Sequence, residues 1–331
     1  MTTQKQFDDF LEDIEPSRTT VEKCSSAHNT LRKKLKDDAT FGEVHVGTFL
    51  SGSYKRDTAV RPQLIDGELQ RPDVDIIVET SHSEDDEPKE VLDMLHQALV
   101  DAGYANLKVN RRSIAVTLAG VDMDVVPVIA NNEAFLIPDI ELKKWLSTNP
   151  AGHTQWTIDT NKRADGRFKR LVKLFKWWRR LHLADLRRPK GFILECLVEK
   201  HMSYTEKNYE TLFVGLLESI RDTYGFYVDL GLVPNIDDPA VPGNNVFSNV
   251  TADEFARFYG KVNESAGNAR KALDEDDDDK ALALWREVLG CRFPAAACRT
   301  ASANSLLRAA VGVGLTFPAK AVLPNKPAGF A

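Results

Sequence analysis

Residues 71–80 read RPDVDIIVET, a short β-branched run that follows a proline and predicts a strand. Side chains on a strand alternate between the two faces of a sheet, so Asp73 and Asp75 point to the same face. A buried carboxylate without a partner is unfavourable, so this pair predicts cations or hydrogen-bond donors beside it. Taken alone, the pair also fits a strand edge whose aspartates only face water.

Residues 121–128, VDMDVVPV, repeat this pattern. Asp122 and Asp124 lie two positions apart in an apolar run, so they also share one face of a strand. Residues 106–129 as a whole read as two strands joined at Gly120. The alternative that the aspartates only face water would have to hold for two separate strands. The repeated pattern therefore favours a site where the carboxylates converge. The strand period alone does not choose between Asp122 and Asp124.

The composition fits a folded protein with one large domain or two lobes. The chain has 331 residues, of which 43% are hydrophobic and 28% are charged. We expect a cytoplasmic protein, because no basic and apolar leader opens the sequence and no apolar run reaches the roughly 20 residues of a membrane helix. The net charge of −6 argues against a general nucleic-acid coat. The four cysteines lack CxxC spacing and the seven histidines are scattered, which predicts reduced thiols and no zinc site.

The hydrophobic period changes along the chain from mixed to helical. Residues 7–38 have helical spacing, residues 40–50 alternate like a half-buried strand, and residues 89–102 are helical again. From about Pro138 to Pro294 the period is helical. Together these segments predict an α+β protein.

We expect two lobes and a tail. They are an α/β lobe that includes an N-terminal helix, a helical lobe, and a flexible tail, at residues 1–137, 138–300 and 301–331. The acidic run DEDDDD at residues 274–279 predicts a solvated loop rather than a metal site, because like charges repel.

A glycine turn lies upstream of the first aspartate pair. Residues 50–56 read LSGSYKR, with Gly52 and Ser53 directly after a predicted strand. Glycine lets the backbone approach a phosphate closely, and amides at the start of a helix bind anionic oxygen. A Gly-Ser pair alone is more often an ordinary turn. Beside two acidic strands it predicts a triphosphate held with two Mg²⁺ ions, for which Mn²⁺ is an alternative, and hence nucleotidyl transfer.

Residues 166–183, GRFKRLVKLFKWWRRLHL, form the most basic helix expected in the chain. One face carries apolar side chains and another carries basic ones. The apolar face consists of Leu171, Leu174, Phe175, Trp178 and Leu181, and the basic face of Lys169, Lys173, Lys176 and Arg180. For an amphipathic helix without further context, the basic face would simply be solvated.

These motifs, in this order, resemble a known family. GS, then DVD and DVVP on strands, then RLVKLFKWW and KGFILE, look like the nucleotidyltransferases that include oligoadenylate synthetase and cyclic GMP-AMP synthase. The chain is most similar to the bacterial CD-NTases of CBASS anti-phage systems, and within them to clade D, through RPDVDIIV, LVKLFKWWRR, RPKGFILE and VTADEFARFYG. The similarity covers about residues 5–300. It implies a bilobal polymerase-beta-like fold, with a mixed-sheet catalytic lobe at residues 1–137 and a helical C-terminal lobe at residues 138–300 that closes over the nucleotide site.

The resemblance also implies roles for individual residues. Asp73, Asp75 and Asp124 match the catalytic metal-binding triad, and Asp122 lies outside it. The positions that match nucleotide-binding residues are Gly52, Ser53, Lys173, Lys176 and Phe192.

The chain departs from the family pattern at two places. Many relatives have a serine and an aromatic residue where this chain has Gly191 and Phe192, so a serine contact to the triphosphate is missing. Phe192 offers a flat face for a base, and a core phenylalanine is an equal alternative. The segment from Ser53 to Asp73 is longer than usual, which predicts a loop insertion at the mouth of the site.

The resemblance implies a second-messenger synthase that makes a cyclic di- or trinucleotide containing adenine from nucleoside triphosphates, with ATP as the expected substrate, for anti-phage defence. Two alternatives share the same metal site. One is a template-independent polymerase or a transferase acting on RNA or protein, and the other is a catalytically idle nucleotide sensor.

Two kinds of protein partner follow from the same resemblance. One is a HORMA-type regulator with its Trip13-like ATPase. The other is a ubiquitin-like transfer apparatus, similar to E1 and E2 enzymes, that would act on the C-terminal Ala331. An ordinary disordered terminus explains the KPAGFA ending equally well.

Overall fold

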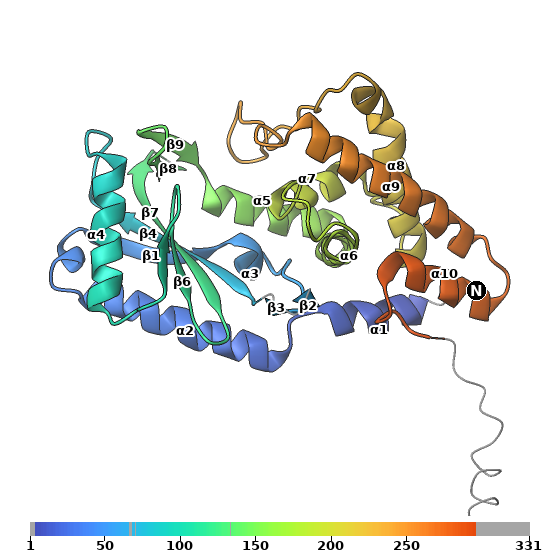
Figure 1. Cartoon of the computed structure of the whole chain (residues 1–331), viewed down its shortest axis with the longest axis horizontal. Coiled ribbons are helices and arrows are strands. Elements are labelled where there is room, and N and C mark those ends of the chain that lie inside the picture. The colour runs from blue at the N-terminus through green and yellow to red at the C-terminus, as the bar shows by residue number, and fades with distance from the viewer. Residues whose placement is uncertain (1–3, 66–67, 70, 133, 296–331) are drawn as a thin grey trace, which may run out of the picture.

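The computed structural model describes residues 4–65, 68–69, 71–132 and 134–295 (Figure 1). A mixed sheet with helices forms one end of the molecule, and a group of helices forms the other end (Figure 1). The α+β fold class expected from the sequence is confirmed.

The helices, with the short 3₁₀ turn η1, are α1 (Gln4–Ile14), α2 (Arg18–Asp37), η1 (Phe41–Glu43), α3 (Gly52–Arg56), α4 (Pro88–Asp101), α5 (Pro150–Arg163), α6 (Arg167–His182), α7 (Phe192–His201), α8 (Tyr209–Asp229), α9 (Ala252–Leu273) and α10 (Asp278–Leu289). The strands are β1 (His45–Ser51), β2 (Leu64–Ile65), β3 (Glu68–Leu69), β4 (Asp73–Thr80), β5 (Leu107–Val109), β6 (Ile114–Thr117), β7 (Asp122–Asn131), β8 (Ala134–Asp139) and β9 (Lys144–Thr148).

The main sheet is built around a parallel pair of strands. Its strand order is β1-β4-β7-β6-β5, and β8 and β9 extend it from the far end of β7. β4 and β7 run parallel, and the other neighbours in this sheet are antiparallel. β2 and β3 form a separate hairpin in the segment that is longer than the family pattern.

The two central strands have faces of different character. Val74 and Ile76 of β4 pack with Met123 of β7 in a core that α2 and α4 cover. The opposite face begins with the aspartates and continues with Ile77 and Val126, which form a small separate cluster. The strand period therefore directs the aspartates away from the main core of the sheet.

A second core joins the helices at the other end of the molecule. Its largest fully buried side chains include Phe7, Phe10, Trp178, Trp285 and Phe293. The Phe7 ring lies 5.0 Å from the Trp285 ring and 5.1 Å from the Phe293 ring. α1 thus packs among the late helices, whereas α2 lies along the sheet (Figure 1). The predicted lobe boundaries at residues 137 and 300 stay a prediction.

The first helical segment is two helices rather than one over residues 7–38. Pro16 has no amide hydrogen and disfavours a helical conformation at Glu15, so α1 ends before it. Ser17 then caps α2 by accepting a hydrogen bond from the Thr20 amide at 3.2 Å. The helix expected at residues 89–102 is confirmed as α4.

Two expectations about strands were wrong. Residues 106–129 contain three strands instead of two, because the polar turn between Asn110 and Ser113 divides the first strand into β5 and β6. The helical period expected from Pro138 starts only at α5, since β8 and β9 first extend the sheet.

The acidic run at residues 274–279 is partly helical. Asp277 caps α10 by accepting from the Lys280 amide at 3.0 Å, and the next two aspartates lie in its first turn. Carboxylates are favourable at that end of a helix because they face the positive end of its dipole.

Three further expectations concern the whole chain. In the part of the chain that the structure describes, no helix is both long and apolar enough to cross a membrane. The thiols of Cys24, Cys196 and Cys291 are free, as expected. The predicted tail at residues 301–331 lies outside the described residues.

Candidate active site

Four aspartates form two rows across the parallel strands. Asp73 pairs in register with Asp122, and Asp75 pairs with Asp124. All four stand on one face, because the members of each pair are two residues apart on a strand. The convergence of carboxylates that the two sequence patterns predicted is therefore present on this face of the sheet.

Three of these four side chains form a compact cluster. Asp73, Asp75 and Asp124 each offer an oxygen, and these oxygens all lie within 4.8 Å of one another. The Asp73 side chain is exposed, and the other two are half-buried. Asp122 turns instead to Arg71, whose guanidinium lies 3.5 Å from its carboxylate. The geometry thus separates the two aspartates of β7, which strand period could not do.

The glycine turn reaches this cluster through β1. Ser51, the last residue of β1, is the register partner of Asp75 on β4. Gly52 follows with a φ of +67°, and a Cβ at that position would lie 1.6 Å from Oδ2 of Asp75. Only glycine permits both this backbone conformation and this close approach. Ser53 lies in the first turn of α3, beside the carboxylates.

Asp124 is held by two donors from the turn between β5 and β6. The Ser113 hydroxyl donates to its Oδ1 at 3.2 Å and the Asn110 amide donates at 3.4 Å. The buried carboxylate of Asp139 anchors this turn, since Arg111 donates to it at 2.7 Å. A hydrogen-bonded chain therefore runs from β8 to the acidic cluster and fixes the Asp124 carboxylate.

Burial and like charge raise the pKa values of the cluster. The Asp73 side chain keeps contact with water, but partial desolvation among its neighbours is still the larger cause of its shift, and with the charges of Asp75 and Asp124 it raises the pKa of that carboxyl to about 8. Burial and the charge of Asp124 also raise the pKa of Asp75. Burial raises the pKa of Asp124, although its two hydrogen bonds lower it in part. The cluster therefore carries more negative charge than the neighbouring side chains neutralise.

This donor set fits a hard divalent cation. It consists of carboxylate oxygens alone, the ligands that Mg²⁺ prefers in proteins. The raised pKa values of these carboxyl groups also favour a bound cation, because a cation would offset the repulsion between the carboxylates. Asp73, Asp75 and Asp124 are thus the residues that would hold a metal.

A buried ionic network lies directly behind the glycine turn. Glu195 on α7 accepts from Arg56 Nε at 2.9 Å, from Lys176 Nζ at 2.7 Å and from the Thr58 hydroxyl at 2.9 Å. Burial alone would raise the pKa of Glu195, but the charges of Lys176 and Arg56 hold it at about 2. The network joins α3 to helices α6 and α7. Its two cations also lower the pKa of Asp75.

The lysines predicted to meet the nucleotide are engaged within the protein. Lys176 is nine-tenths buried and bonded to Glu195 and Thr58, although it borders a cavity described below. Lys173 pairs with Glu15 at 2.8 Å and with Asp57 at 2.9 Å. Lys173 and Lys176 of the basic face of α6 are therefore buried against acidic partners instead of forming a solvated flank. On the apolar face, Leu181 is exposed.

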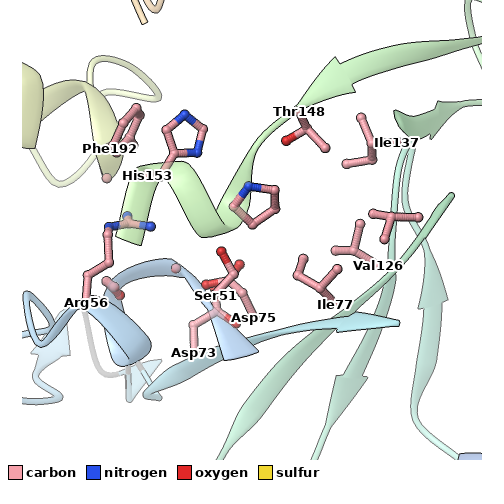
Figure 2. Close-up of a pocket in the computed structure, with 15 residues that line it drawn as sticks. Ser51, Arg56, Asp73, Asp75, Ile77, Val126, Ile137, Thr148, His153 and Phe192 are labelled. Atoms are coloured by element: carbon pink, nitrogen blue, oxygen red, sulfur yellow. The ribbon is translucent and has the colours of Figure 1, made fainter. Parts of the chain in front are cut away.

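A cavity of about 420 Å³ opens beside the acidic cluster (Figure 2). Its floor is the aspartate face of the sheet, with Asp75, Ile77 and Val126, and its roof carries His153 and Phe192 (Figure 2). The volume is within the usual range for small-molecule sites. Apolar walls with a few polar groups suit a nucleobase.

Phe192 lines this cavity and also packs against the helical core. The His153 ring lies 4.4 Å from its ring at 55°, and the Arg56 guanidinium lies over the ring at 5.1 Å. The ring therefore meets both the core and the cavity, and its stacking on a base stays a prediction. Gly191, which precedes it, has a φ of +59° and open space around its Cα.

A second cavity of about 790 Å³ lies on the other side of Asp73 and is strongly basic. The basic side chains that border it are Arg71, Lys176, Arg179, Arg180, Arg187 and Lys190. Within the described ranges, no ion pair holds Arg180 or Lys190. Burial, together with the charge of Arg179, lowers the pKa of both groups, that of Arg180 to about 10. Asp73, Asp122 and Asp185 also border this cavity, but the positive charge of Arg180 and Lys190, which no ion pair in the described ranges offsets, suits a polyphosphate.

Sequence reasoning missed Arg56, Glu195 and His153. A signal for Glu195 was present, since it is an acidic residue inside the apolar helix FILECLVE. Arg56 follows the glycine turn by one helical turn, which is a weaker signal. Nothing in the sequence around His153 distinguishes it, because its partner Asp238 is distant in the chain.

Comparison with protein families places the site in context. Residues 1–161 match the model of the Second Messenger Oligonucleotide or Dinucleotide Synthetase domain. The chain is 64% identical over 337 residues to the cyclic AMP-AMP-AMP synthase of an Acinetobacter species, with 100% of this chain and 98% of that protein covered. It is 27% identical over 394 residues to the cyclic AMP-AMP-GMP synthase of Enterobacter hormaechei, with 100% of each covered.

Solved structures share the fold. The CdnC of E. coli MS115-1, solved with ATP, gives a TM-score of 0.68 at 20% identity over 88% of this chain and 99% of that chain. Vibrio cholerae DncV gives a TM-score of 0.68 at 12% identity over 86% of this chain and 92% of that chain. The similarity in fold extends across both ends of the molecule.

Proposed function

Because this chain belongs to the CD-NTase family of cyclic oligonucleotide synthases, we propose that it converts ATP into cyclic AMP-AMP-AMP at the cluster of Asp73, Asp75 and Asp124. The chain is a nucleotidyltransferase that makes a cyclic oligonucleotide, and its relatives include CBASS oligonucleotide cyclases. The observation that supports this product is the 64% identity, over the full chain, to a cyclic AMP-AMP-AMP synthase.

The three clustered carboxylates are the proposed ligands of two Mg²⁺ ions. The all-oxygen donor set and the raised pKa values of these groups support this assignment. When bound, the ions supply Lewis-acid activation of the attacking hydroxyl and neutralise charge on the leaving pyrophosphate. Asp124, fixed by Ser113 and Asn110, is the proposed acceptor for the proton of the attacking 3′ hydroxyl.

The protein orients the nucleotides with groups on either side of the cluster. Gly52 and Ser53 present backbone amides to a phosphate, at a point where no side chain intervenes. The basic cavity suits the remaining phosphates, and the cavity below Phe192 suits a base. Lys176 borders the basic cavity and adds to its positive potential. For Lys173, we propose an indirect role through Asp57, the residue that follows α3.

Product analysis tests this function. The purified chain is incubated with ATP, GTP, CTP, UTP and Mg²⁺, treated with phosphatase, and the resistant product is identified by mass spectrometry and nuclease digestion. We expect cyclic AMP-AMP-AMP as the main product, formed from ATP alone. A cyclic dinucleotide or a guanine-containing trinucleotide would contradict the proposed product. A linear ladder or a labelled macromolecule would contradict cyclisation.

We also propose a HORMA-type regulator, with its Trip13-like ATPase, as a partner. A solved complex of E. coli MS115-1 CdnC with a HORMA protein, at a TM-score of 0.67 and 20% identity, supports this proposal. Adding a purified HORMA-type partner should raise the rate of synthesis. An unchanged rate with the purified pair would count against it.

Conjugation of Ala331 by a ubiquitin-like transfer apparatus remains a proposal from the resemblance to clade D. Ala331 lies outside the described residues. Deleting Ala331 should remove a conjugate of higher mass in cells that carry the partner enzymes. The same conjugate in the deletion variant would exclude this terminus as the attachment point.

A further inference from the structure

His153 occupies a position that the proposed reaction has not yet used. It lies on α5, lines the cavity beside the acidic cluster, and stands next to Phe192 above the carboxylates (Figure 2). Neither the strand patterns nor the phosphate turn requires an imidazole here. The His153 side chain is therefore considered as a contact for a ligand in this cavity.

One nitrogen of this ring is tied to a buried carboxylate. His153 Nε2 lies 2.7 Å from Oδ1 of Asp238, which does not line the cavity. The same oxygen accepts from the backbone amides of Ala240 at 2.9 Å and Val241 at 3.1 Å. Burial alone would raise the pKa of Asp238, but its hydrogen bonds from His153 and these amides lower it. An oxygen in this state is an acceptor, so Nε2 donates.

In the neutral ring, this contact fixes the tautomer. A neutral imidazole has one donor nitrogen and one acceptor nitrogen. With the hydrogen on Nε2, Nδ1 of the neutral His153 ring is an acceptor. No residue in the described ranges forms a hydrogen bond with Nδ1, so that atom remains for a ligand. The arrangement of Asp238, His153 and a ligand is the usual way in which a second residue sets the polarity of a histidine.

The other polar groups of the cavity do not offer the same discrimination. The Thr148 hydroxyl rotates, so it serves equally as donor or acceptor. Ser51 and Ser53 lie at the phosphate turn, and Arg56 is held by Glu195. Among the side chains that line this cavity away from the carboxylates, His153 is therefore the one whose role as hydrogen-bond acceptor is fixed by a neighbour.

From these contacts we infer that His153, oriented by Asp238, reads the base in this cavity and selects adenine over guanine. Its Nδ1 accepts a hydrogen bond from the exocyclic amino group at position 6 of adenine. Guanine has a carbonyl oxygen there, so two acceptors would face each other without a proton. This inference rests on the proposed function, because it assumes that a purine nucleotide enters the cavity.

The size of the effect follows from the cost of an unmade hydrogen bond. A buried acceptor that loses its donor disfavours the wrong ligand by about tenfold or more. Wild-type protein should therefore bind a non-hydrolysable ATP analogue at least about tenfold more tightly than the GTP analogue. In competition at equal concentrations, adenine should dominate the product.

Two substitutions of His153 distinguish the effect of the hydrogen-bond acceptor from the effect of the flat ring. His153→Phe keeps a flat ring beside Phe192 but has no acceptor, and should reduce the ratio of ATP to GTP affinity by about tenfold. His153→Gln replaces the ring nitrogens with an amide that donates to Asp238 and keeps a carbonyl acceptor, and should lose less of the ratio. His96→Gln on α4 makes the same chemical change away from the cavity and serves as the matched control.

The affinity ratio is measured by equilibrium binding of the two analogues, and incorporation by competition in one tube. Both ratios are independent of the fraction of active protein. If His153→Phe retains the wild-type ratio, or if the Phe and Gln variants lose it equally, the inference is overturned. If His153→Phe loses the preference for the ATP analogue but wild-type protein yields a product other than cyclic AMP-AMP-AMP, the proposed product fails while base selection by His153 stands.

Discussion

Asp75 and Asp124 are direct register partners on the parallel strands β4 and β7. The backbones of these two residues cannot separate without breaking the sheet, because each belongs to a central strand. The sheet thus holds like charges together, and their pKa values rise through burial and, for Asp75, through the charge of Asp124.

The metal-free protein should lose stability as the pH rises. A carboxyl group has a pKa near 4 in the unfolded chain, and the folded-state values here are raised, to about 8 for Asp73. Their contribution is therefore fully present below about pH 4 and is lost as the pH rises through the folded-state values. Water and counter-ions screen the exposed Asp73 carboxylate, so the buried Asp75 should contribute more.

The measurement is the melting temperature between pH 4 and pH 8 in a chelator, for wild-type protein and for Asp75→Asn. The gap between the two should widen in favour of the variant as the pH rises. At pH 8, Mg²⁺ should raise the melting temperature of the wild-type protein and leave that of the variant nearly unchanged. A gap that does not depend on pH would show that repulsion in the cluster is negligible.

Asp124→Asn and Asp122→Asn should differ sharply in activity. Asp124 belongs to the cluster, and its loss should reduce synthesis by about a thousandfold, as expected when a catalytic cation loses a ligand. Asp122 pairs with Arg71 outside the cluster, so its loss should cost less than about tenfold. Initial rates at saturating ATP and Mg²⁺ measure this. Equal losses would mean that both aspartates act on the metal.

Gly52→Ala should inactivate the enzyme. The added Cβ would lie 1.6 Å from Oδ2 of Asp75, so either the turn or the carboxylate must move. We expect a loss of at least about a hundredfold in activity, because a displacement of about 1 Å at a reacting centre has that effect. Gly103→Ala is the matched control, since Gly103 also has a positive φ, +85°, but has open space around it. Similar losses in both variants would point to backbone strain instead of the contact with Asp75.

Glu195→Gln should destabilise the protein strongly. It would leave Arg56 and Lys176 buried beside a neutral group, and breaking a buried ion pair in this way costs about 3–5 kcal/mol. Chemical denaturation measures the free energy of unfolding. The control is Glu199→Gln on the same helix, where a partly exposed pair with Arg163 should contribute less than about 1 kcal/mol. Equal changes would show that the buried network adds nothing beyond a surface pair.

The strand period was sufficient to predict that the aspartates of β4 and β7 share a face. It was not sufficient to separate Asp122 from Asp124, because that difference depends on Arg71 for one and on Ser113 and Asn110 for the other. These contacts join residues from three different parts of the chain. No local pattern reports them.

The basic face of α6 illustrates a second limit. Its helical spacing was predicted correctly, but a pattern of lysines reads as solvated unless its partners are known. Lys176 is buried because Glu195 lies opposite it on α7, and Lys173 because Glu15 and Asp57 approach it. Tertiary partners, not the helix itself, determined where these charges lie.

The contact of Phe7 with Trp285 and Phe293 has a consequence for how the protein forms. A ribosome makes α1 first and α10 among the last helices, so the earliest apolar segment has no partner while most of the chain is synthesised. Contacts between such distant residues close a very large loop and slow folding. The sheet, with α2 and α4, can assemble before them. We therefore expect folding to finish with the docking of α1 against α10.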